Sequence, residues 1–140
     1  EKHYRDGERL LRVLRGASLE VFPGEIVSIV GASGSGKSTF LHLLGALDRA
    51  TAGSIIFNGR DYRSLSNAEL AALRNRSIGF IFQFHHLLAE FTALENAVIP
   101  GLIAGHSFHS LAEKARERLQ ALEEQVKVLD EQGAVHGLDA

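Results

Sequence analysis

Residues 31–39 read GASGSGKST, and this stretch decides the fold class of the 140-residue chain. Its first eight residues match the pattern G-x-x-x-x-G-K-[ST] at every fixed position. Glycines let the backbone curl so that successive N–H groups point at phosphate oxygens, and the next helix aims its positive end at the same anion. We predict that Lys37 contacts the β- and γ-phosphates of a nucleotide and that the Ser38 hydroxyl binds Mg²⁺.

The residues on either side of this phosphate loop (residues 31–39) indicate an α/β fold. Residues 26–30 (IVSIV) are a short, β-branched run, which is typical of a strand buried on both faces of a parallel sheet. Residues 39–47 (TFLHLLGAL) are apolar at helical spacing. A strand, a glycine loop and a helix in this order are the context that a phosphate loop requires, which disfavours the alternative of a glycine-rich turn with a chance lysine.

Further strands and turns are expected before and after the loop. Residues 17–21 (ASLEV) alternate in polarity as a strand does, and Pro23-Gly24 signals a turn. Residues 54–62 predict a strand that runs into a tight turn at Asn58-Gly59. Residues 78–82 (IGFIF) predict another strand.

Three capping boxes predict the starts of three helices, because each has Ser or Thr three residues before Glu. They begin at Ser66, Thr92 and Ser110. Pro100-Gly101 is expected to close the second helix. Apolar residues after Ser110 step by threes and fours, which predicts a long amphipathic helix that stops near Gly133.

The composition excludes several classes of site and partner. The net charge of −2 gives no general reason to expect nucleic acid, and the lack of cysteine excludes disulfides and thiolate metal sites. The first ten residues contain no apolar signal core, and no run of about 18 apolar residues predicts a membrane span. The pairs His85-His86 and His106/His109 have no nearby carboxylate or third ligand at a familiar spacing, so we expect no metal site there.

Two long stretches carry a resemblance to a known family. Residues 13–61 (VLRGASLEVFPGEIVSIVGASGSGKSTFLHLLGALDRATAGSIIFNGRD) and 73–100 (LRNRSIGFIFQFHHLLAEFTALENAVIP) resemble the ATP-binding subunits of ABC transporters. FQFHHLL followed by EFTALEN is most similar to the subunits of bacterial lipoprotein-releasing exporters. The likeness covers about residues 4–105.

The resemblance implies an α/β P-loop NTPase core with an antiparallel β portion and a C-terminal helical arm. It implies that Tyr4 stacks on adenine, with an incidental surface aromatic as the alternative. It also implies that Gln83 contacts Mg²⁺ and the attacking water, with a plain polar residue at a strand end as the alternative. The expected catalytic residues are thus Lys37 and Gln83, and the metal contacts are Ser38 and Gln83. The expected nucleotide-binding residues are Tyr4, Gly31, Ser33, Gly34, Ser35, Gly36, Lys37, Ser38 and Thr39.

The resemblance further implies membrane partners and a cellular location. Residues 84–95 lie where the family forms a groove for a helix of the transmembrane subunit, and ordinary core packing is the alternative. Ala89 stands where family members commonly have proline. The apolar candidates for this groove are Leu87, Leu88 and Phe91. The implied location is cytoplasmic, at the inner face of the bacterial inner membrane.

Other family motifs are not found in these residues. Residues 39–140 show no apolar strand that ends in a Mg²⁺-holding carboxylate, no LSGGQ-like signature and no recognisable switch histidine. We therefore expect binding of ATP and Mg²⁺, while hydrolysis and the family's homodimer are in question.

We expect two parts, a partial ATP-binding domain at residues 1–105 and a divergent helical tail at residues 106–140. The tail has seven acidic and four basic residues, which concentrates the negative charge there. Its apolar stripe is expected to pack on the domain, and pairing with another copy is the alternative. The alternative function is accordingly a non-catalytic interaction protein that associates through this helix.

Overall fold

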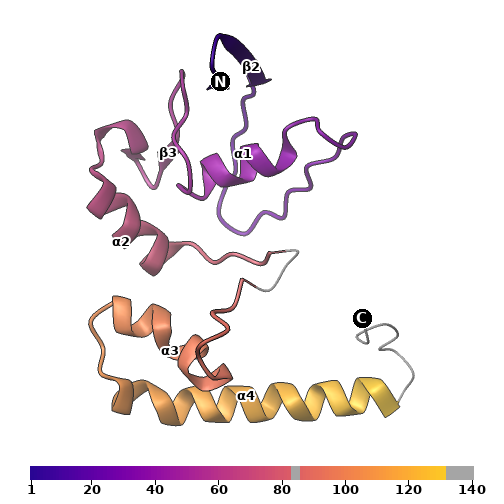
Figure 1. Ribbon diagram of the computed structural model, residues 1–140, viewed down its shortest axis with the longest axis vertical. Helices are drawn as coiled ribbons and strands as arrows, with labels where there is room; N and C mark the ends of the chain where they lie inside the picture. The colour runs from indigo at the N-terminus through magenta and orange to yellow at the C-terminus, as the bar shows by residue number, and fades with distance from the viewer. Residues whose placement is uncertain (83–85, 132–140) are drawn as a thin grey trace. The chain divides into compact units, whose positions relative to one another are not determined.

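The computed structural model describes residues 1–82 and 86–131, and the chain divides into two compact units, Glu1–Phe80 and Ile81–Ala140. The first unit contains β1 (Lys2–Asp6), β2 (Arg9–Leu14), α1 (Lys37–Leu44), β3 (Ile56–Phe57), β4 (Arg60–Asp61), the 3-10 helix η1 (Tyr62–Ser64) and α2 (Asn67–Ser77) (Figure 1). The second unit contains α3 (Ala93–Ile103) and α4 (Phe108–Glu131).

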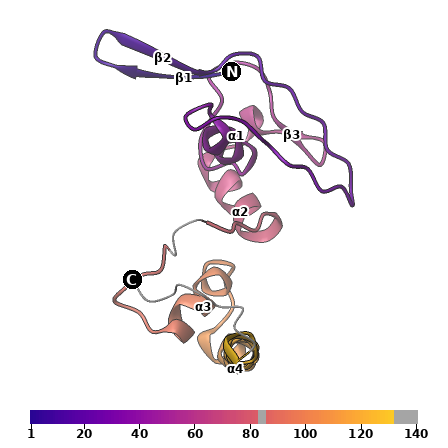
Figure 2. The same cartoon turned by 90° about the vertical axis from the view of Figure 1, so that its right-hand side faces the viewer.

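The antiparallel β portion near the N-terminus is confirmed, but its strands are β1 and β2 rather than residues 17–21 (Figure 2). Tyr4 lies opposite Leu11, and Asp6 lies opposite Arg9 at the closed end. The two-residue connection begins with Gly7 at φ 57, a left-handed conformation that glycine adopts without a steric penalty. The Asp6-Gly7 pair is the sequence signal that could have located this hairpin.

The predicted tight turn at Asn58-Gly59 is confirmed. β3 and β4 pair antiparallel, with Phe57 opposite Arg60. Asn58 and Gly59 have φ values of 49 and 76, and two positive values in a row are the mark of a type I′ hairpin turn. The strand predicted after this turn extends to Tyr62, which is one residue too long, because β4 ends at Asp61 and Tyr62 begins η1.

The strands expected at residues 17–21, 26–30 and 78–82 are not formed in the part of the chain that the structure describes. A parallel strand exists only through a ladder with its neighbours, and the described residues place no strand beside these segments. The side chain of Ile26 is accordingly fully exposed. Pro23-Gly24 does form the predicted turn, with Gly24 at φ 84.

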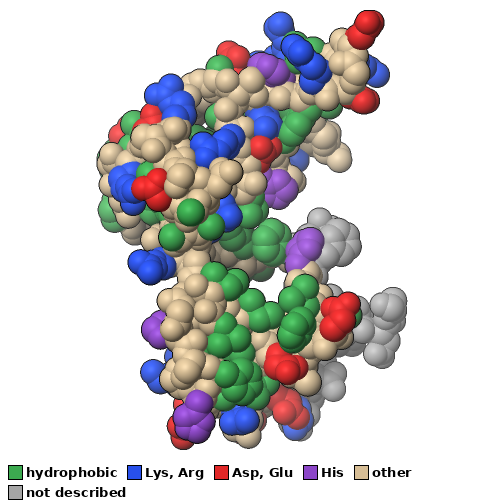
Figure 3. Space-filling view, turned by 60° about the vertical axis from the view of Figure 1, so that its left-hand side comes forward, with side chains coloured by type: hydrophobic (Ala, Val, Ile, Leu, Met, Phe, Trp, Pro, Cys, Tyr) green, Lys and Arg blue, Asp and Glu red, His purple; other side chains and the backbone are tan. Residues whose placement is uncertain are grey.

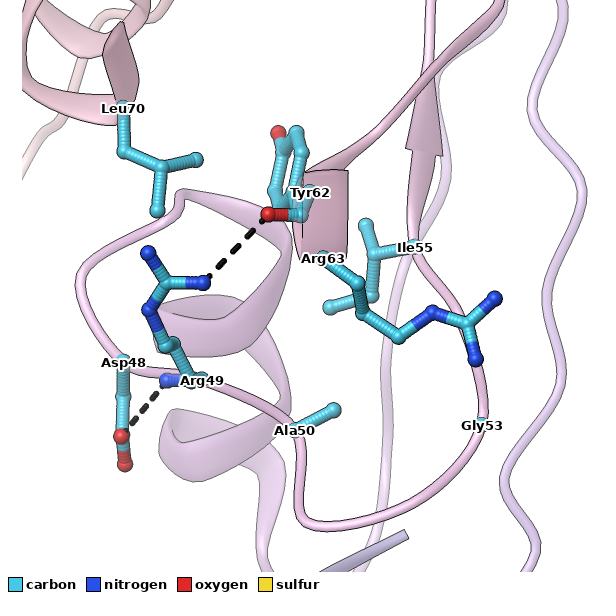
Figure 4. Close-up of a pocket in the computed structure, with 8 residues that line it drawn as sticks. All are labelled: Asp48, Arg49, Ala50, Gly53, Ile55, Tyr62, Arg63 and Leu70. Atoms are coloured by element: carbon cyan, nitrogen blue, oxygen red, sulfur yellow. Dashed lines mark hydrogen bonds between the residues drawn. The ribbon is translucent and has the colours of Figure 1, made fainter. Parts of the chain in front are cut away.

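The core of the first unit lies between α1, η1 and α2. Its buried residues are Ala46, Tyr62, Leu65 and Leu70, with Ile55, Phe57 and Leu73 packed against them. The Tyr62 hydroxyl donates to the Leu44 carbonyl at 2.9 Å, so the polar end of this buried side chain has a hydrogen-bond partner. A pocket of about 130 Å³ borders this core, and the Arg49 guanidinium reaches into it toward the Tyr62 carbonyl (Figure 4).

The predicted helix boundaries are confirmed for α2 and in part for α3. Both capping boxes are complete, at Ser66–Glu69 and at Thr92–Glu95. Pro100-Gly101 does not close α3, which continues to Ile103. Gly101 serves helix packing instead, because a Cβ there would lie 2.6 Å from the Leu111 side chain of α4.

The long amphipathic helix is confirmed as α4, but its predicted start at Ser110 is wrong. Its predicted stop near Gly133 lies outside the described residues. The Ser107 hydroxyl accepts from the Ser110 N–H at 3.3 Å, so the cap lies one turn earlier and Ser110 is inside the helix. Ala112 of this helix is buried and Leu111 contacts α3. Leu122 and Val126, farther along, are exposed.

Exposed hydrophobic side chains gather over α3 and α4 on the face of the second unit drawn in Figure 3. On α3, Leu102 is 40% exposed and Ile103 is 70% exposed. Among the described residues, no helix is both long enough and apolar enough to cross a membrane.

Candidate nucleotide-binding site

The phosphate loop has the tight curl that its glycines predict. The Ser35 N–H donates to the Ala32 carbonyl at 3.2 Å, and Gly34 has a φ of 77. A Cβ at Gly31 would lie 2.9 Å from the Ser35 hydroxyl oxygen, so a larger residue there would press into the loop. The loop is therefore closed on itself ahead of α1, and Gly31, Ser33, Gly34 and Ser35 all lie within this short segment.

Gly36 joins the loop to α1 and also to the hairpin. It is the N-cap of α1 with a φ of 93, which side chains rarely adopt. A Cβ at this position would lie 2.9 Å from the Leu14 side chain and 3.1 Å from that of Val13. Strand β2 thus packs directly on the start of α1, and only glycine satisfies both the conformation and the space.

The start of α1 is open to an anion. No side chain caps it, and its first turn contains no acidic residue. The first N–H groups of a helix have no partner within the helix, and together with the helix dipole they favour a negative charge. A phosphate group would supply the acceptors that no side chain of α1 provides.

Lys37, Ser38 and Thr39 form the first turn of this helix. The Lys37 ammonium group reaches back and donates to the Gly31 and Ala32 carbonyls, at 2.8 Å each. Ser38 is exposed, so its hydroxyl is accessible to a hydrated metal ion. The structure thus brings the predicted lysine, the predicted Mg²⁺ contact and the glycine loop together.

Tyr4 of β1 lies beside the same first turn. Its hydroxyl donates to Asp48 Oδ2 at 2.9 Å. Burial, and then the hydrogen bond to Asp48, raise the pKa of Tyr4, while the nearby Thr39 side chain works in the opposite direction. Tyr4 as a residue is 40% exposed, so it is both anchored and accessible.

Asp48 and Lys2 are residues at this site that the sequence analysis did not include. The Lys2 ammonium lies 2.7 Å from Asp48 Oδ1 and 4.6 Å from the centre of the Tyr4 ring. Burial, the largest single influence, raises the pKa of Asp48, but the hydrogen bonds from Lys2, Tyr4 and the Arg49 N–H together lower it below its ordinary value. No sequence motif links these residues, which lie more than forty positions apart.

The predicted catalytic and Mg²⁺-binding role of Gln83 falls on a residue outside the described part of the chain. Its role stays a prediction. Among residues 1–82 and 86–131, no group of three or more His, Asp or Glu side chains is arranged to hold a metal ion. The metal contact that the described residues offer at the loop is the Ser38 hydroxyl.

The segment that follows Gln83 exposes the three side chains predicted to line a partner groove. Leu87, Leu88 and Phe91 are 65%, 47% and 46% exposed. The turn that carries them is held by Asn96, whose Oδ1 accepts from the Leu88 N–H at 2.9 Å. Asn96 Nδ2 donates at 3.0 Å to three carbonyls of the same turn, those of Leu88, Phe91 and Thr92. Ala89 therefore lies in a turn that the hydrogen bonds of Asn96 stabilise.

A family model described as ABC transporter matches residues 14–137. The chain belongs to this family. The match includes most of residues 106–140, while the boundary at residue 105 stays a prediction. The fold class expected from the sequence, a P-loop NTPase core of the ABC type, is confirmed, and members of this family use ATP with Mg²⁺.

The most informative relatives are two bacterial proteins, both named lipoprotein-releasing system ATP-binding protein LolD. The one from Geobacter metallireducens is 56% identical over 118 residues, which are 84% of this chain and 52% of the relative. The one from Shewanella frigidimarina is 47% identical over 137 residues, which are 98% of this chain and 53% of the relative. The chain thus spans about half the length of the curated relatives it matches.

Solved structures of the ATP-binding cassette MJ0796 agree with this assignment. Two of them match with a TM-score of 0.77 and 38% identity, over 87% of this chain and 54% of the cassette. One is the dimeric post-hydrolysis state bound to ADP and Pi. The match confirms that the described elements are part of an ABC cassette.

Proposed function

We propose that this chain binds MgATP through the phosphate loop, as the ATP-binding part of an ABC exporter that releases lipoproteins. The observation that carries the proposal is the start of α1. Gly36 opens the helix in a left-handed conformation, no side chain caps it, and the Lys37 ammonium lies against the loop. The two relatives named for lipoprotein release support the choice of exporter.

The residues present fit the nucleotide. The free N–H groups of the loop and of α1 would hold phosphate oxygens, and Lys37 would exchange its bonds to the Gly31 and Ala32 carbonyls for bonds to phosphate. The Ser38 hydroxyl is an oxygen ligand of the kind that Mg²⁺ prefers. The exposed Tyr4 ring would face the base. Bound ATP would supply a phosphoanhydride bond whose hydrolysis by water releases free energy.

The proposed partners are the transmembrane subunits of the exporter. The exposed Leu87, Leu88 and Phe91 support a contact through the segment after Gln83, because apolar side chains on a fixed turn suit a helix-in-groove contact. This arrangement would place the chain at the cytoplasmic side of the bacterial inner membrane.

We propose further that residues 1–140 bind nucleotide without turning it over on their own. Hydrolysis in P-loop proteins needs a carboxylate beyond the loop to hold Mg²⁺ and a group that orients the attacking water. No apolar strand within residues 39–140 ends in Asp or Glu. The LSGGQ-like sequence that would complete the site of a second subunit is also not among these residues.

Thermal unfolding with and without MgATP tests the binding. A ligand that binds only the folded state stabilises it by about 2.7 kcal/mol at a hundredfold excess over Kd. We expect a clear rise in Tm for the unmodified chain and none for Lys37→Ala. Lys127→Ala is a matched control, because this lysine is an exposed residue of α4 that pairs with Glu123 of the same helix.

Two results would contradict the proposal. One is a cooperative melt that MgATP does not shift, and the other is a shift that Lys37→Ala retains. Phosphate release above background would contradict the part that concerns turnover. Self-association that is indifferent to MgATP and lost in Leu122→Glu would favour the alternative of an interaction protein, because Leu122 and Val126 are exposed on α4.

A further inference from the structure

We propose that Asp48 and Lys2 are positioning residues, which hold the Tyr4 ring at the edge of the phosphate loop with one face turned to the nucleobase. This inference rests on the proposed binding of MgATP. Stacking on a base requires only the ring of Tyr4. The inference also requires the Tyr4 hydroxyl, because that group bonds to Asp48.

The Asp48 carboxylate is the centre of the arrangement. Its Oδ1 accepts from the Lys2 ammonium at 2.7 Å, and its Oδ2 accepts from the Tyr4 hydroxyl at 2.9 Å. Both oxygens are therefore used, and each binds a different residue of β1. Since charge-assisted hydrogen bonds are stronger than neutral ones, the two bonds together fix the strand against the end of α1.

Lys2 is buried, with only 8% of the residue exposed, although lysine is rarely buried unless it is paired. Its ammonium group donates to Asp48 and also to the Arg49 carbonyl at 2.9 Å. It lies 4.6 Å from the centre of the Tyr4 ring, a cation–π distance. One face of the ring is thus covered by Lys2, while the exposed part of the ring is available for stacking on a base.

The support behind Asp48 is rigid. The Arg49 N–H donates to Asp48 Oδ1 at 2.7 Å, and the Arg49 side chain runs away from it into the pocket of Figure 4. There the guanidinium donates to the Leu65 carbonyl and to Asn67 Oδ1, at 2.9 Å each. The backbone that follows Asp48 is thereby tied to the start of α2, which restricts the position of the carboxylate.

The hairpin also reaches the loop itself, because a Cβ at Gly36 would lie 2.9 Å from the Leu14 side chain of β2, the strand that pairs with β1. The ring that would contact the base and the loop that would contact the phosphates are then held in one arrangement before a ligand arrives. Such preorganisation improves affinity by reducing the entropy lost on binding. The benefit applies to a ligand that carries a base and not to a bare polyphosphate.

Binding of MgATP and of magnesium tripolyphosphate to the full 140-residue chain, measured by calorimetry, tests the inference. The variants are Tyr4→Phe, Asp48→Ala and the double variant. We expect each single variant to weaken MgATP binding about three- to tenfold, the range for loss of one hydrogen bond, and to leave tripolyphosphate binding unchanged. The double variant should be no weaker than either single one, because both changes break the same tie.

Tyr4→Phe is the cleaner variant, because Asp48→Ala also leaves the Lys2 ammonium without its carboxylate. Tyr62→Phe is the matched control, since it makes the same change in the only other tyrosine of the chain. Tyr62 donates to the Leu44 carbonyl in the core, so its variant should lower stability and leave the preference for MgATP over tripolyphosphate intact. In that background tyrosine fluorescence reports Tyr4 alone, because the chain has no tryptophan.

The outcomes separate the inference from the proposed function. MgATP affinity that is unchanged in Tyr4→Phe would overturn the inference alone, because the ring would then suffice. Equal loss of both ligands in Asp48→Ala, or losses that add in the double variant, would also overturn it. Failure of the unmodified chain to bind either ligand would overturn the proposed function together with the inference. Quenching of Tyr4 fluorescence by MgATP that is smaller in Asp48→Ala would support it.

Discussion

Helix α1 begins in the opposite way from α2 and α3. In α2 and α3 a Ser or Thr hydroxyl accepts from the backbone of a glutamate, and that glutamate accepts from the backbone of the cap, so the helix start is satisfied within the protein. In α1 a left-handed Gly36 takes the cap position, with no side-chain bond and no acid in the first turn.

The difference teaches how one chain can have helix starts that are satisfied internally and one that is left open to an anion. The glutamates of α2 and α3 already place a negative charge where the helix dipole favours it. The start of α1 has the same preference for a negative charge but no acidic side chain, and the Lys37 ammonium group lies close by against the loop. A stable helix start and an anion site are thus alternative uses of the same N–H groups.

The largest effect is expected from Gly36→Ala. A left-handed alanine costs about 1–2 kcal/mol, and pressing its Cβ against Leu14 and Val13 adds about 1–3 kcal/mol. Gly34→Ala is the matched control, because Gly34 has a similar φ of 77 but nothing within 4 Å of its Cβ position. Urea unfolding should show a clearly larger loss for Gly36→Ala. Equal losses would mean that the hairpin does not pack on α1.

Thr39→Glu tests the comparison directly, because it gives α1 the acid at the third position that α2 and α3 have. The new carboxylate would repel phosphate from the helix start. We expect MgATP binding to weaken about tenfold or more, since the repulsion between two like charges costs over about 1 kcal/mol near a surface. Thr39→Gln is the matched control, because it has the same length without the charge. Calorimetry that finds the two variants equally weak would show that charge at this helix start does not matter.

Ser66→Ala and Thr92→Ala should each cost about 1 kcal/mol of stability, the usual cost of losing an N-cap hydroxyl. The Ser66 hydroxyl accepts from the Glu69 N–H at 3.2 Å, and the Thr92 hydroxyl accepts from the Glu95 N–H at 3.3 Å. Urea unfolding measures the loss, and MgATP affinity should not change. A fall in affinity in Ser66→Ala would mean that the two kinds of helix start are not independent.

The smallest effect is a dependence on pH at the two capping boxes. The N–H groups of Ser66 and Thr92, and then their hydroxyls, hold the pKa of Glu69 and of Glu95 below the ordinary value. Because the folded-state pKa is the lower one, this contribution to stability is present above about pH 4.3 and is lost as the pH falls through the folded-state pKa. Carboxyl NMR titrations should show the lowered values. Ordinary values would contradict the capping geometry.

The features that sequence reasoning located are those fixed by neighbours along the chain. The phosphate loop, the turn at Asn58-Gly59 and the boxes at Ser66 and Thr92 each lie within a few residues, and each needs particular residue types for its own backbone. The start of α4 was placed one turn late because Ser107 and Ser110 offer the same hydroxyl, and local spacing cannot choose between them.

The segments expected as parallel strands show the limit of local pattern. Residues 26–30 have a suitable composition, but a strand also needs a ladder partner, and the described residues place none beside them. Likewise Pro100-Gly101 reads locally as a helix stop, whereas Gly101 lies within α3 against Leu111 of α4.

By itself the sequence determined the family, the glycine loop with Lys37 and Ser38, and the helix starts at Ser66 and Thr92, because these depend on short-range backbone geometry. Tertiary structure decided that β2 packs on Gly36 and that Lys2 and Asp48 surround Tyr4. Those contacts join residues far apart in the chain, and they depend on which surfaces the folded chain buries together. A one-dimensional pattern does not contain that information.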